Sequence, residues 1–203
     1  PVQPFSLARY PVTWAQYRAF LDAADGYCNP AWWEDRPREE KPGSLLWSFA
    51  NYPVINVSWY DALAYCRWLS KKLQLPIRLP TVWEWQWAAV GRTQQDYQWG
   101  EWNEQRANSH KAGIGRTVAV GLYPLGRSPF GVDDMTGNVW EWCLNLYDQP
   151  SDIALNSSGD RVVCGGSWHY IPDFVRSSVR SNFHPVSRFF NIGFRVLCES
   201  PIE

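Results

Sequence analysis

The side chains of this sequence that could do redox or metal chemistry are few and far apart. The five cysteines are odd in number and form no CxxC pair, which argues against a disulfide framework and against a zinc site. A pairing of Cys164 with Cys198 stays open, and Cys66, on an apolar helical stripe, is expected to be a buried hydrophobe. The histidines are expected on the surface or in loops. The candidates are Cys28, Cys66, Cys143, Cys164, Cys198, His110, His169 and His184.

Several functional classes are excluded by composition and by missing motifs. The formal net charge is -1 and no basic run is present, so we expect no nucleic-acid partner. There is no GxSxG or Walker-type loop and no apolar run long enough for membrane insertion. No signal peptide is seen, which slightly favours the cytoplasm over the cell surface. The abrupt start at Pro1 leaves open an upstream domain, to which this one would be fused or bound.

The segment 164–198 combines a frame of Gly, Pro, Trp and Arg with unrelated residues set between them. These inserted residues follow neither a helical nor a strand period, so we expect most of them in loops or on the surface. Many are apolar, and an exposed apolar cluster usually marks a contact surface. The alternative is that the phenylalanines are ordinary core residues. The frame residues are Gly165, Gly166, Ser167, Trp168, Pro172, Arg176, Arg180, Pro185, Arg188, Gly193, Phe194 and Arg195.

The elements that must position this segment are helices in the first half and strands in the second. Capping boxes at Thr13 and Thr81, and an N-cap at Ser58, predict three helix starts. The expected helices are 14–24, 59–73 and 81–90, and 26–51 is expected to be a long ordered loop. The expected strands are 5–10, 118–123, 139–146, 161–163 and 194–198. Helices first and strands afterwards indicate a single α+β domain over residues 1–203.

Four stretches in a fixed order carry a family resemblance. They are YPVINVSWYDALAYCRWL (52–69), RLPTVWEWQWAA (78–89), GVDDMTGNVWEWC (131–143), and CGGSW followed by GFRV (164–196). Together they resemble the formylglycine-generating enzyme family, a variant of the C-type lectin fold. The resemblance covers nearly the whole chain. It implies an irregular α+β domain with two main helices and a small antiparallel sheet.

The same resemblance bears on catalysis. The family's enzymes bind copper with two cysteines placed shortly after the GGS motif and oxidise a substrate cysteine. Here the corresponding segment, WHYIPDFVRSSVR, contains no cysteine. We therefore predict that the chain is not an enzyme and has no redox cofactor. A metal-dependent oxidase acting on a thiol or peptide is the alternative, and a purely structural accessory domain is a third possibility.

A narrower resemblance concerns the inserted residues. The frame is similar to the variable region of proteins diversified by retroelements, in which AAC codons become any NNC codon. NNC codons cannot encode Lys, Gln, Glu, Met or Trp, and none of these occurs at the inserted positions. This resemblance implies a ligand-binding domain that recognises variable partners, which we expect to be proteins. The predicted ligand-binding positions, called the insert positions below, are His169, Tyr170, Ile171, Asp173, Phe174, Val179, Ser181, Asn182, Phe183, His184, Val186, Ser187, Phe189, Phe190 and Asn191.

Arginines and aromatic residues of this segment receive different predicted roles. The frame arginines are expected to anchor the segment through hydrogen bonds to carbonyls or carboxylates, unless they form a solvated basic face. The aromatic insert residues are expected to be binding anchors, because aromatic side chains are enriched at binding hot spots. The predicted anchors are Tyr170, Phe174, Phe183, Phe189 and Phe190.

A calcium site is implied by the resemblance at DMTGNVWE. In the family, a side-chain oxygen at the position of Asp134, carbonyls at Gly137 and Val139, and the carboxylate of Glu141 surround the ion. Such hard oxygen ligands suit a structural Ca²⁺. The alternative is an Asx turn at Asp134 with Glu141 paired to an arginine. A second family site would use Asn108, but its later carboxylate has no match here.

Overall fold

Three α-helices and two small sheets make up the α+β domain in this computed structural model, which describes residues 3–34, 36–38, 46–93 and 95–199. Each helix begins at a capping box. In it, the side chain of the N-cap residue accepts a hydrogen bond from the backbone N–H of the third helical residue, whose own side chain accepts one from the backbone N–H of the N-cap residue. The predicted helix starts are therefore confirmed. The helices are α1 (Trp14–Asp22), α2 (Trp59–Leu73) and α3 (Val82–Val90).

The two sheets hold the ends of the chain and the candidate site. In the three-stranded sheet, β7 lies between β1 and β2, so the last described strand ties down the first. The four-stranded sheet has the order β5-β4-β3-β6, and only the β3–β6 pair is parallel. The strands are β1 (Ser6–Leu7), β2 (Ile77–Arg78), β3 (Trp140–Leu146), β4 (Arg161–Cys164), β5 (Arg180–Phe183), β6 (Ile192–Gly193) and β7 (Leu197–Cys198).

Three sequence-based expectations about strands are wrong, and the first concerns 5–10, where only β1 (Ser6–Leu7) forms. The stretch 118–123 is irregular rather than a strand, because its backbone turns at Gly121, which has a φ of 73°. The expected strand 194–198 shortens to β7, since the chain changes sheets after β6. The expected loop 26–51 contains a short 3-10 helix, and parts of it fall outside the described residues. The 3-10 helices are η1 (Pro30–Trp32), η2 (Glu104–Arg106), η3 (His110–Ala112), η4 (Pro124–Gly126) and η5 (Pro172–Phe174).

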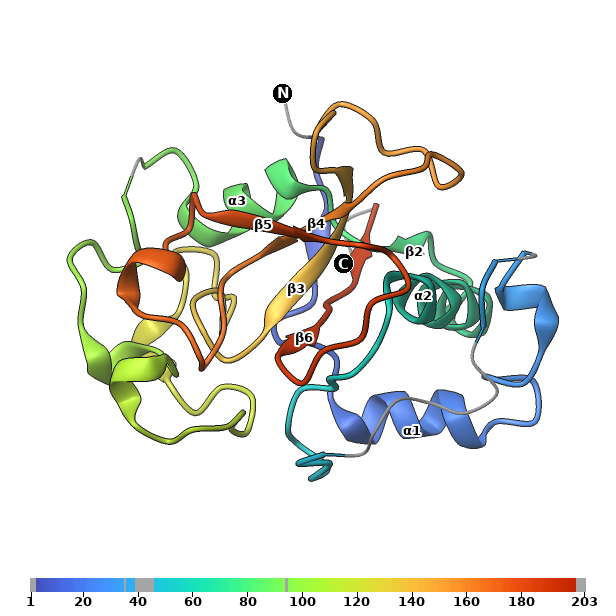
Figure 1. Cartoon of the computed structure of the whole chain (residues 1–203), viewed down its shortest axis with the longest axis horizontal. Helices are drawn as coiled ribbons and strands as arrows, with labels where there is room; N and C mark the ends of the chain where they lie inside the picture. Colours follow the sequence, from blue (N-terminus) through green and yellow to red (C-terminus); the bar gives the residue numbers. More distant parts are fainter. Residues whose placement is uncertain (1–2, 35, 39–45, 94, 200–203) are drawn as a thin grey trace.

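Aromatic side chains fill the main core between α1, α2 and the sheets. Tyr17 and Tyr65 meet Phe194 with ring centroids 6.3 and 5.4 Å apart, an edge-to-face arrangement that such rings favour. A second buried cluster lies between α3 and the strands β3 and β4. Figure 1 shows α1 and α2 together on one side of the four-stranded sheet, with β5 and the loops that follow it crossing the front. Among the described residues, no helix is long and apolar enough to span a membrane.

Candidate functional site

The segment between β4 and β7 is folded by close backbone contacts that only glycine allows. At Gly166, where φ is 70°, an added Cβ would lie 2.3 Å from Val175 Cγ1 and 2.8 Å from the carbonyl oxygen of Phe174. At Gly193, it would lie 2.4 Å from the carbonyl oxygen of Val54. Neither site has room for a side chain. The two glycines therefore fix the path of the chain near both ends of the segment.

Main-chain hydrogen bonds hold the insert loops whatever side chains they carry. Such bonds use only N–H and C=O groups, so they survive substitution by any residue except proline. Several of them join the segment to the rest of the domain. Examples run from the amide of Trp168 to the carbonyl of Asn138 (3.1 Å), from Asn56 to Phe189 (3.0 Å), from Trp59 to Pro185 (3.1 Å) and from Trp140 to Asn191 (2.9 Å).

Arg188 anchors the loop between β5 and β6 to the first turn of α2. Its Nε and Nη2 donate to the carboxylate of Asp61 at 2.7 and 2.8 Å, and Asp61 is almost fully buried. Burial alone would lower the pKa of Arg188, but the charge of Asp61 and the hydrogen bonds to it outweigh that effect and raise it. Asp61 also accepts from the backbone N–H of Ser58, which closes the capping box of α2. One carboxylate thus joins the helix to the loop.

Arg195 forms the most deeply buried ion pair among the described residues. Its Nε and Nη2 donate to Glu141 at 2.6 Å each, and both side chains are fully buried. The indole N–H of Trp85 donates to the same carboxylate at 2.8 Å. A paired geometry of this kind is what allows a charge to be buried. The predicted anchoring role is therefore confirmed for Arg195, and for Arg188.

The other two frame arginines lie nearer the solvent. Arg176 is 39% exposed and pairs with Asp173 at 2.5 Å and with Asp96 at 3.6 Å. Arg180 lies over the ring of Tyr147, 5.0 Å from its centroid. Asp173 is itself an insert position, so its ion pair is one place where an inserted residue and the frame interact.

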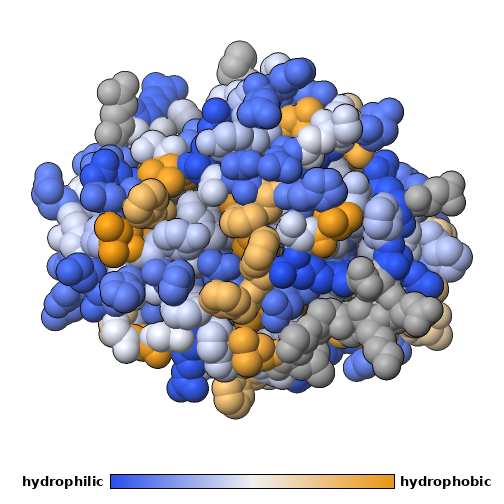
Figure 2. Space-filling model, in the orientation of Figure 1, coloured by the Kyte–Doolittle hydropathy of each residue, from blue (hydrophilic) through white to orange (hydrophobic). Residues whose placement is uncertain are grey.

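The insert side chains face outward, in contrast to the frame. All insert positions except Asn191 are at least partly exposed. We call the exposed ones, together, the insert surface. Figure 2 shows apolar side chains gathered at the centre of the face on which β5 and the following loop lie in Figure 1. The insert surface consists of His169, Ile171, Asp173, Phe174, His184, Val186, Phe189 and Phe190.

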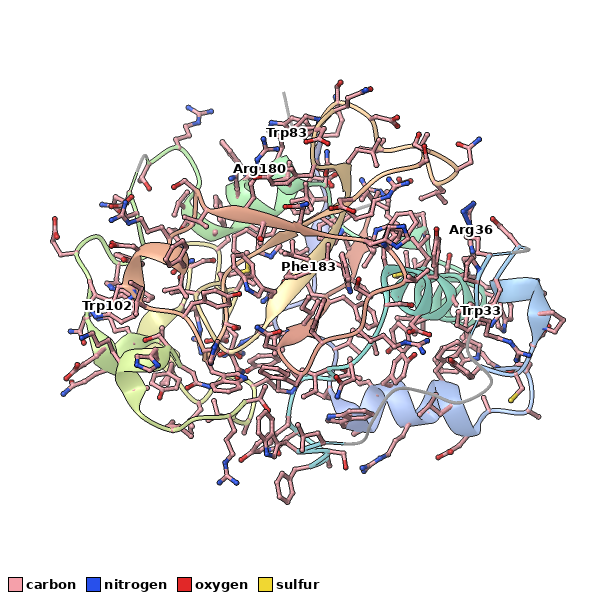
Figure 3. All side chains as sticks on the ribbon, viewed as in Figure 1. Trp33, Arg36, Trp83, Trp102, Arg180 and Phe183 are labelled. Atoms are coloured by element: carbon pink, nitrogen blue, oxygen red, sulfur yellow. The ribbon has the colours of Figure 1, made fainter. Side chains whose placement is uncertain are left out.

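Frame and core tryptophans support the aromatic residues of this surface. Trp168 meets His169 and Phe190 with ring centroids 5.2 and 5.7 Å apart. The ring centroids of Phe189 and Phe183 lie 4.9 Å apart. Phe183 in turn packs edge-to-face against the buried Trp142. Figure 3 shows Phe183 near the middle of this face. The rings of His169 and Phe190 thus rest on a frame tryptophan, whereas Phe189 rests on Phe183, which is itself an insert position.

Some insert positions contribute to the structure of the domain. Asn191 is buried, and its Nδ2 donates to Ser167 Oγ at 3.2 Å, so the expectation that it faces a ligand is not met. The Nδ2 of Asn182 donates to Asp160 at 2.6 Å. The partly buried Tyr170, Val179 and Phe183 pack against the main core. Each of these side chains has a local partner that the sequence pattern did not reveal.

Sequence reasoning missed a neighbouring aromatic stretch before α2. The ring of Trp47 lies 5.5 Å from that of Trp168, and Trp47 has a φ of 50°, which is unusual for a bulky residue. Phe49 is exposed, and the centroid of its ring lies 5.0 Å from that of Tyr52. A tryptophan and a phenylalanine inside the expected loop 26–51 were the available signal. This stretch borders the insert surface.

The predicted calcium ligands do not fit an ion as they lie. Both oxygens of Glu141 already accept hydrogen bonds from Arg195, which is the arrangement of the alternative interpretation. Asp134 accepts from the N–H of Gly121 at 2.6 Å, and burial raises its pKa to about 6. An ion at Glu141 would have to displace the guanidinium of Arg195. Calcium binding through Asp134, Gly137, Val139 and Glu141 therefore stays a prediction, and no step is derived through it.

At the position of the family's second calcium site, the side-chain oxygen of Asn108 could bind a cation. Asn108 is buried, and its Nδ2 donates to the carbonyl of Arg116 at 2.9 Å and to Asn138 Oδ1 at 3.2 Å. Within the described residues its Oδ1 accepts no hydrogen bond, which leaves an oxygen of the kind that hard cations prefer. Over the same residues, no cluster of three or more His, Cys, Asp or Glu could hold a metal ion.

The cysteines and histidines are placed differently from each other. The pairing of Cys164 with Cys198, which the sequence left open, is not formed: both are free thiols and lie in different sheets. The Sγ atom of Cys164 lies 3.9 Å from that of Cys143 instead. Cys66 is buried as expected, and burial raises the pKa of its thiol well above the ordinary value. The histidines are exposed, also as expected: His110, His169 and His184.

Comparison with known proteins decides the family. The profile of the sulfatase-modifying factor enzyme 1-like domain matches residues 1–200. The chain belongs to this family. It is 31% identical to the hercynine oxygenase of Mycolicibacterium smegmatis over 96% of its own length and 53% of that protein. It is also 31% identical to the formylglycine-generating enzyme of Mycobacterium tuberculosis, over 93% of its own length and 69% of that protein.

A solved structure supports the fold assignment. Treponema denticola variable protein 1 superposes with a TM-score of 0.73 and 24% identity, over 97% of this chain and 84% of that one. At this identity the likeness establishes the fold. The formylglycine-generating variant of the C-type lectin fold, predicted from the sequence, is therefore confirmed.

Membership in this family corrects one expectation. The prediction that the chain is not an enzyme is contradicted, because both curated relatives are named as enzymes. That prediction was based on the absence of cysteines from one segment. The absence of one cysteine pair does not exclude a chain from a family that contains enzymes. The chain spans about half the length of the hercynine oxygenases that it matches.

Proposed function

We propose that this domain binds ligands through the insert surface, whose side chains can be exchanged without unfolding the frame. The supporting observation is the division of the segment: the side chains of the insert surface are exposed, while the glycines and Arg195 beneath them are buried. The main-chain hydrogen bonds of the loops do not depend on the insert side chains. The shared fold of a protein named as a variable protein agrees with this proposal.

The chemistry of the surface favours a protein as its ligand. Phe174, Phe189 and Phe190 are 39 to 52% exposed, and aromatic residues of this kind form the centres of protein interfaces. The one carboxylate, Asp173, is neutralised by Arg176. The patch is broad and nearly uncharged, which suits an apolar region on a folded partner.

A display experiment tests this proposal. The exposed insert positions are randomised with NNC codons, and the library is selected against a panel of unrelated folded proteins, beginning with lysozyme. A matched library randomises Lys71, Lys72 and Gln74, which are exposed at the C-terminal end of α2. We expect most insert variants to remain folded and to yield binders that the α2 library does not. Loss of folding across the insert library, or equal yields from both libraries, would refute the proposal.

A second candidate function is oxidation of a thiol or peptide. The specific observation in its favour is the 31% identity to a formylglycine-generating enzyme across 93% of the chain. The residues 165–197 contain no cysteine, so such an activity would need sulfur ligands elsewhere or a different metal site. Binding of a peptide at the insert surface is compatible with either function.

Oxygen uptake distinguishes the two candidates. The protein is incubated with copper and a cysteine-containing peptide, and dissolved oxygen is followed with an electrode. Uptake that needs both the peptide and the folded protein would support the oxidase. A rate equal to that of copper with heat-denatured protein would leave ligand binding as the supported function.

A further inference from the structure

One edge of the three-stranded sheet presents main-chain groups that the domain does not use. β7 lies between β1 and β2, so β1 is an edge strand. In an antiparallel pair, opposite residues alternate between those that exchange hydrogen bonds and those that do not. The amide of Ala8 donates to the carbonyl of Val196 at 2.9 Å. Ala8 and Ser6 therefore bond to β7, whereas the N–H and C=O of Leu7, which lies between them, point to the open edge.

Neighbouring contacts agree with this orientation of Leu7. Arg9 lies two residues later, and its carbonyl accepts from the amide of Asp133 at 2.9 Å, on the side away from β7. Leu197, which lies opposite Leu7, uses its own main-chain groups for the pairing with β2. Within the described residues, the main chain of Leu7 makes no hydrogen bond. The edge is thus covered at Arg9 and open at Leu7.

The open edge forms one wall of a groove beside α3. The groove has a volume of about 500 Å³, within the range of roughly 300–1,000 Å³ that is typical of ligand sites. Figure 1 shows the first strand, in blue, next to α3. The opposite wall includes Trp87 and Phe130, whose stacked rings have centroids 6.2 Å apart, and Phe130 is 56% exposed. None of the insert positions lines the groove.

The end of the groove near Arg9 carries an excess of positive charge. Arg9 and Arg127 both donate to the carboxylate of Asp133, at 2.6 and 3.0 Å, and this carboxylate is buried. The two arginine side chains are 50 and 39% exposed. Asp133 follows Val132, which lines the groove. Since one carboxylate balances only one of the two guanidiniums, this end favours an acidic group on a ligand.

We propose that the groove binds an extended peptide segment of a partner protein, which adds to β1 as a further strand. The peptide main chain pairs with the N–H and C=O of Leu7, and main-chain bonds of this kind give affinity while side-chain contacts give specificity. Its apolar side chains pack on Trp87 and Phe130, and an acidic residue lies toward Arg9. Because the groove is separate from the insert surface, the domain can hold one constant partner while its insert residues change.

Hydrogen exchange of the full chain tests the main-chain pairing. A library of phage-displayed heptapeptides is selected on the protein, and an enriched peptide is synthesised. In the free protein, the amide of Leu7 should exchange rapidly and that of Ala8 slowly, because only Ala8 donates within the sheet. A saturating amount of the peptide should protect Leu7. An amide of Leu7 that stays unprotected when the peptide is bound would overturn the proposal.

Substitutions separate the main-chain contribution from side-chain packing. Leu7→Pro removes an N–H that the sheet does not use, and edge strands tolerate proline at such positions. Leu7→Ala keeps the N–H and is the matched control. We expect the peptide to bind Leu7→Pro at least about tenfold more weakly than Leu7→Ala in calorimetry. If Leu7→Pro does not fold, N-methylation along the peptide replaces it, and sensitivity at alternate residues is then the expected result. Equal affinities, or uniform sensitivity to methylation, would contradict strand addition.

The aromatic wall and the kind of occupant are tested in the same assay. Phe130→Ala should weaken the peptide at least about tenfold. Leu122→Ala should not, because Leu122 has the same exposed fraction as Phe130 but lies outside the groove. Protection of Leu7 that rises with protein concentration in the absence of peptide, with dimers in sedimentation, would assign the groove to a second copy and overturn the proposal. So would a selection that yields no peptide sensitive to Phe130→Ala. These results leave the insert surface untested, so the two proposals can fail separately.

Discussion

Arg195 and Phe190 lie close together in the sequence but have opposite environments. Arg195 is fully buried and makes hydrogen bonds to a carboxylate and to backbone carbonyls. Phe190 is 40% exposed, and its ring contacts those of Trp168 and His169. The same contrast separates Arg188 from Phe189. Polar frame residues hold the segment inside the domain, while apolar insert residues face the solvent.

This contrast inverts the usual division between apolar core and polar surface. Buried charges are costly unless they are paired, so Arg188 and Arg195 must each keep their particular partner. The domain loses little unfolding free energy when exposed apolar side chains are replaced. The segment is therefore sensitive at its polar positions and tolerant at its apolar ones. The predictions below test that difference, from the largest expected effect to the smallest.

Removing Arg195 should have the largest effect. In Arg195→Met, Glu141 keeps its charge but loses its two hydrogen bonds from the guanidinium, in a site closed to water. Loss of one partner of a buried pair costs about 3–5 kcal/mol of unfolding free energy. Urea unfolding followed by tryptophan fluorescence measures this. The double variant with Glu141→Leu should recover part of the loss, and equal instability of both variants would contradict the pairing argument.

Arg188→Ala should also destabilise the domain strongly. Asp61 would stay buried without its bidentate partner, so we expect a loss of about 2–4 kcal/mol in urea unfolding. Arg176→Ala is the matched control, because that arginine is more exposed and its partner Asp173 reaches the solvent. Its effect should be clearly smaller. Equal effects would mean that burial does not distinguish the two arginines.

The buried carboxyl of Asp134 should make stability fall as the pH rises. Its pKa is raised from 3.8 to about 6, so its contribution is fully present below pH 3.8 and is lost as the pH rises through about 6. In Asp134→Asn, this loss of about 2–3 kcal/mol should be absent. Urea unfolding at pH 4 to 7 in EDTA compares the two proteins. Parallel pH profiles would show that Asp134 titrates normally.

Calcium extends the same experiment. If the predicted ion binds at Asp134, added calcium should stabilise the wild type at pH 7 and reduce the fall in stability between pH 4 and 6. Asp134→Asn should respond less, because it offers one charge fewer to the ion. If added calcium leaves the unfolding free energy of the wild type unchanged, the predicted calcium site is wrong.

The smallest change in stability should come from the exposed rings. Phe189→Ser and Phe190→Ser together should alter the unfolding free energy by less than about 1 kcal/mol, because both side chains already face the solvent. For a binder selected on the wild-type surface, affinity should fall at least about tenfold, as expected for hot-spot aromatics. Biolayer interferometry and urea unfolding measure the two effects. A large stability loss would place these rings in the core.

Local patterns in the sequence predicted the starts of the helices, and they predicted that Arg188 and Arg195 anchor the segment. The capping boxes at Thr13 and Thr81 lie where α1 and α3 begin, since the pattern is local. One interpretation of the sequence paired Glu141 with an arginine, but neither that arginine nor the pairing of Arg188 with Asp61 could be predicted, because the partners are distant in sequence and only the fold brings them close. The burial of Asn191 was missed for the same reason: its partner Ser167 comes from the other end of the segment. The contact between Cys143 and Cys164 depends on strand register, which no local pattern specified.

One measurement tests the central claim most directly. All exposed insert positions, from His169 to Phe190, are replaced at once by a different set of residues permitted by NNC codons, and the thermal midpoint is measured beside that of the original protein. The account predicts a cooperative transition within a few degrees of the original midpoint, together with loss of a binder selected on the original surface. A non-cooperative or strongly lowered transition would contradict it, because the insert side chains would then be part of what folds the domain.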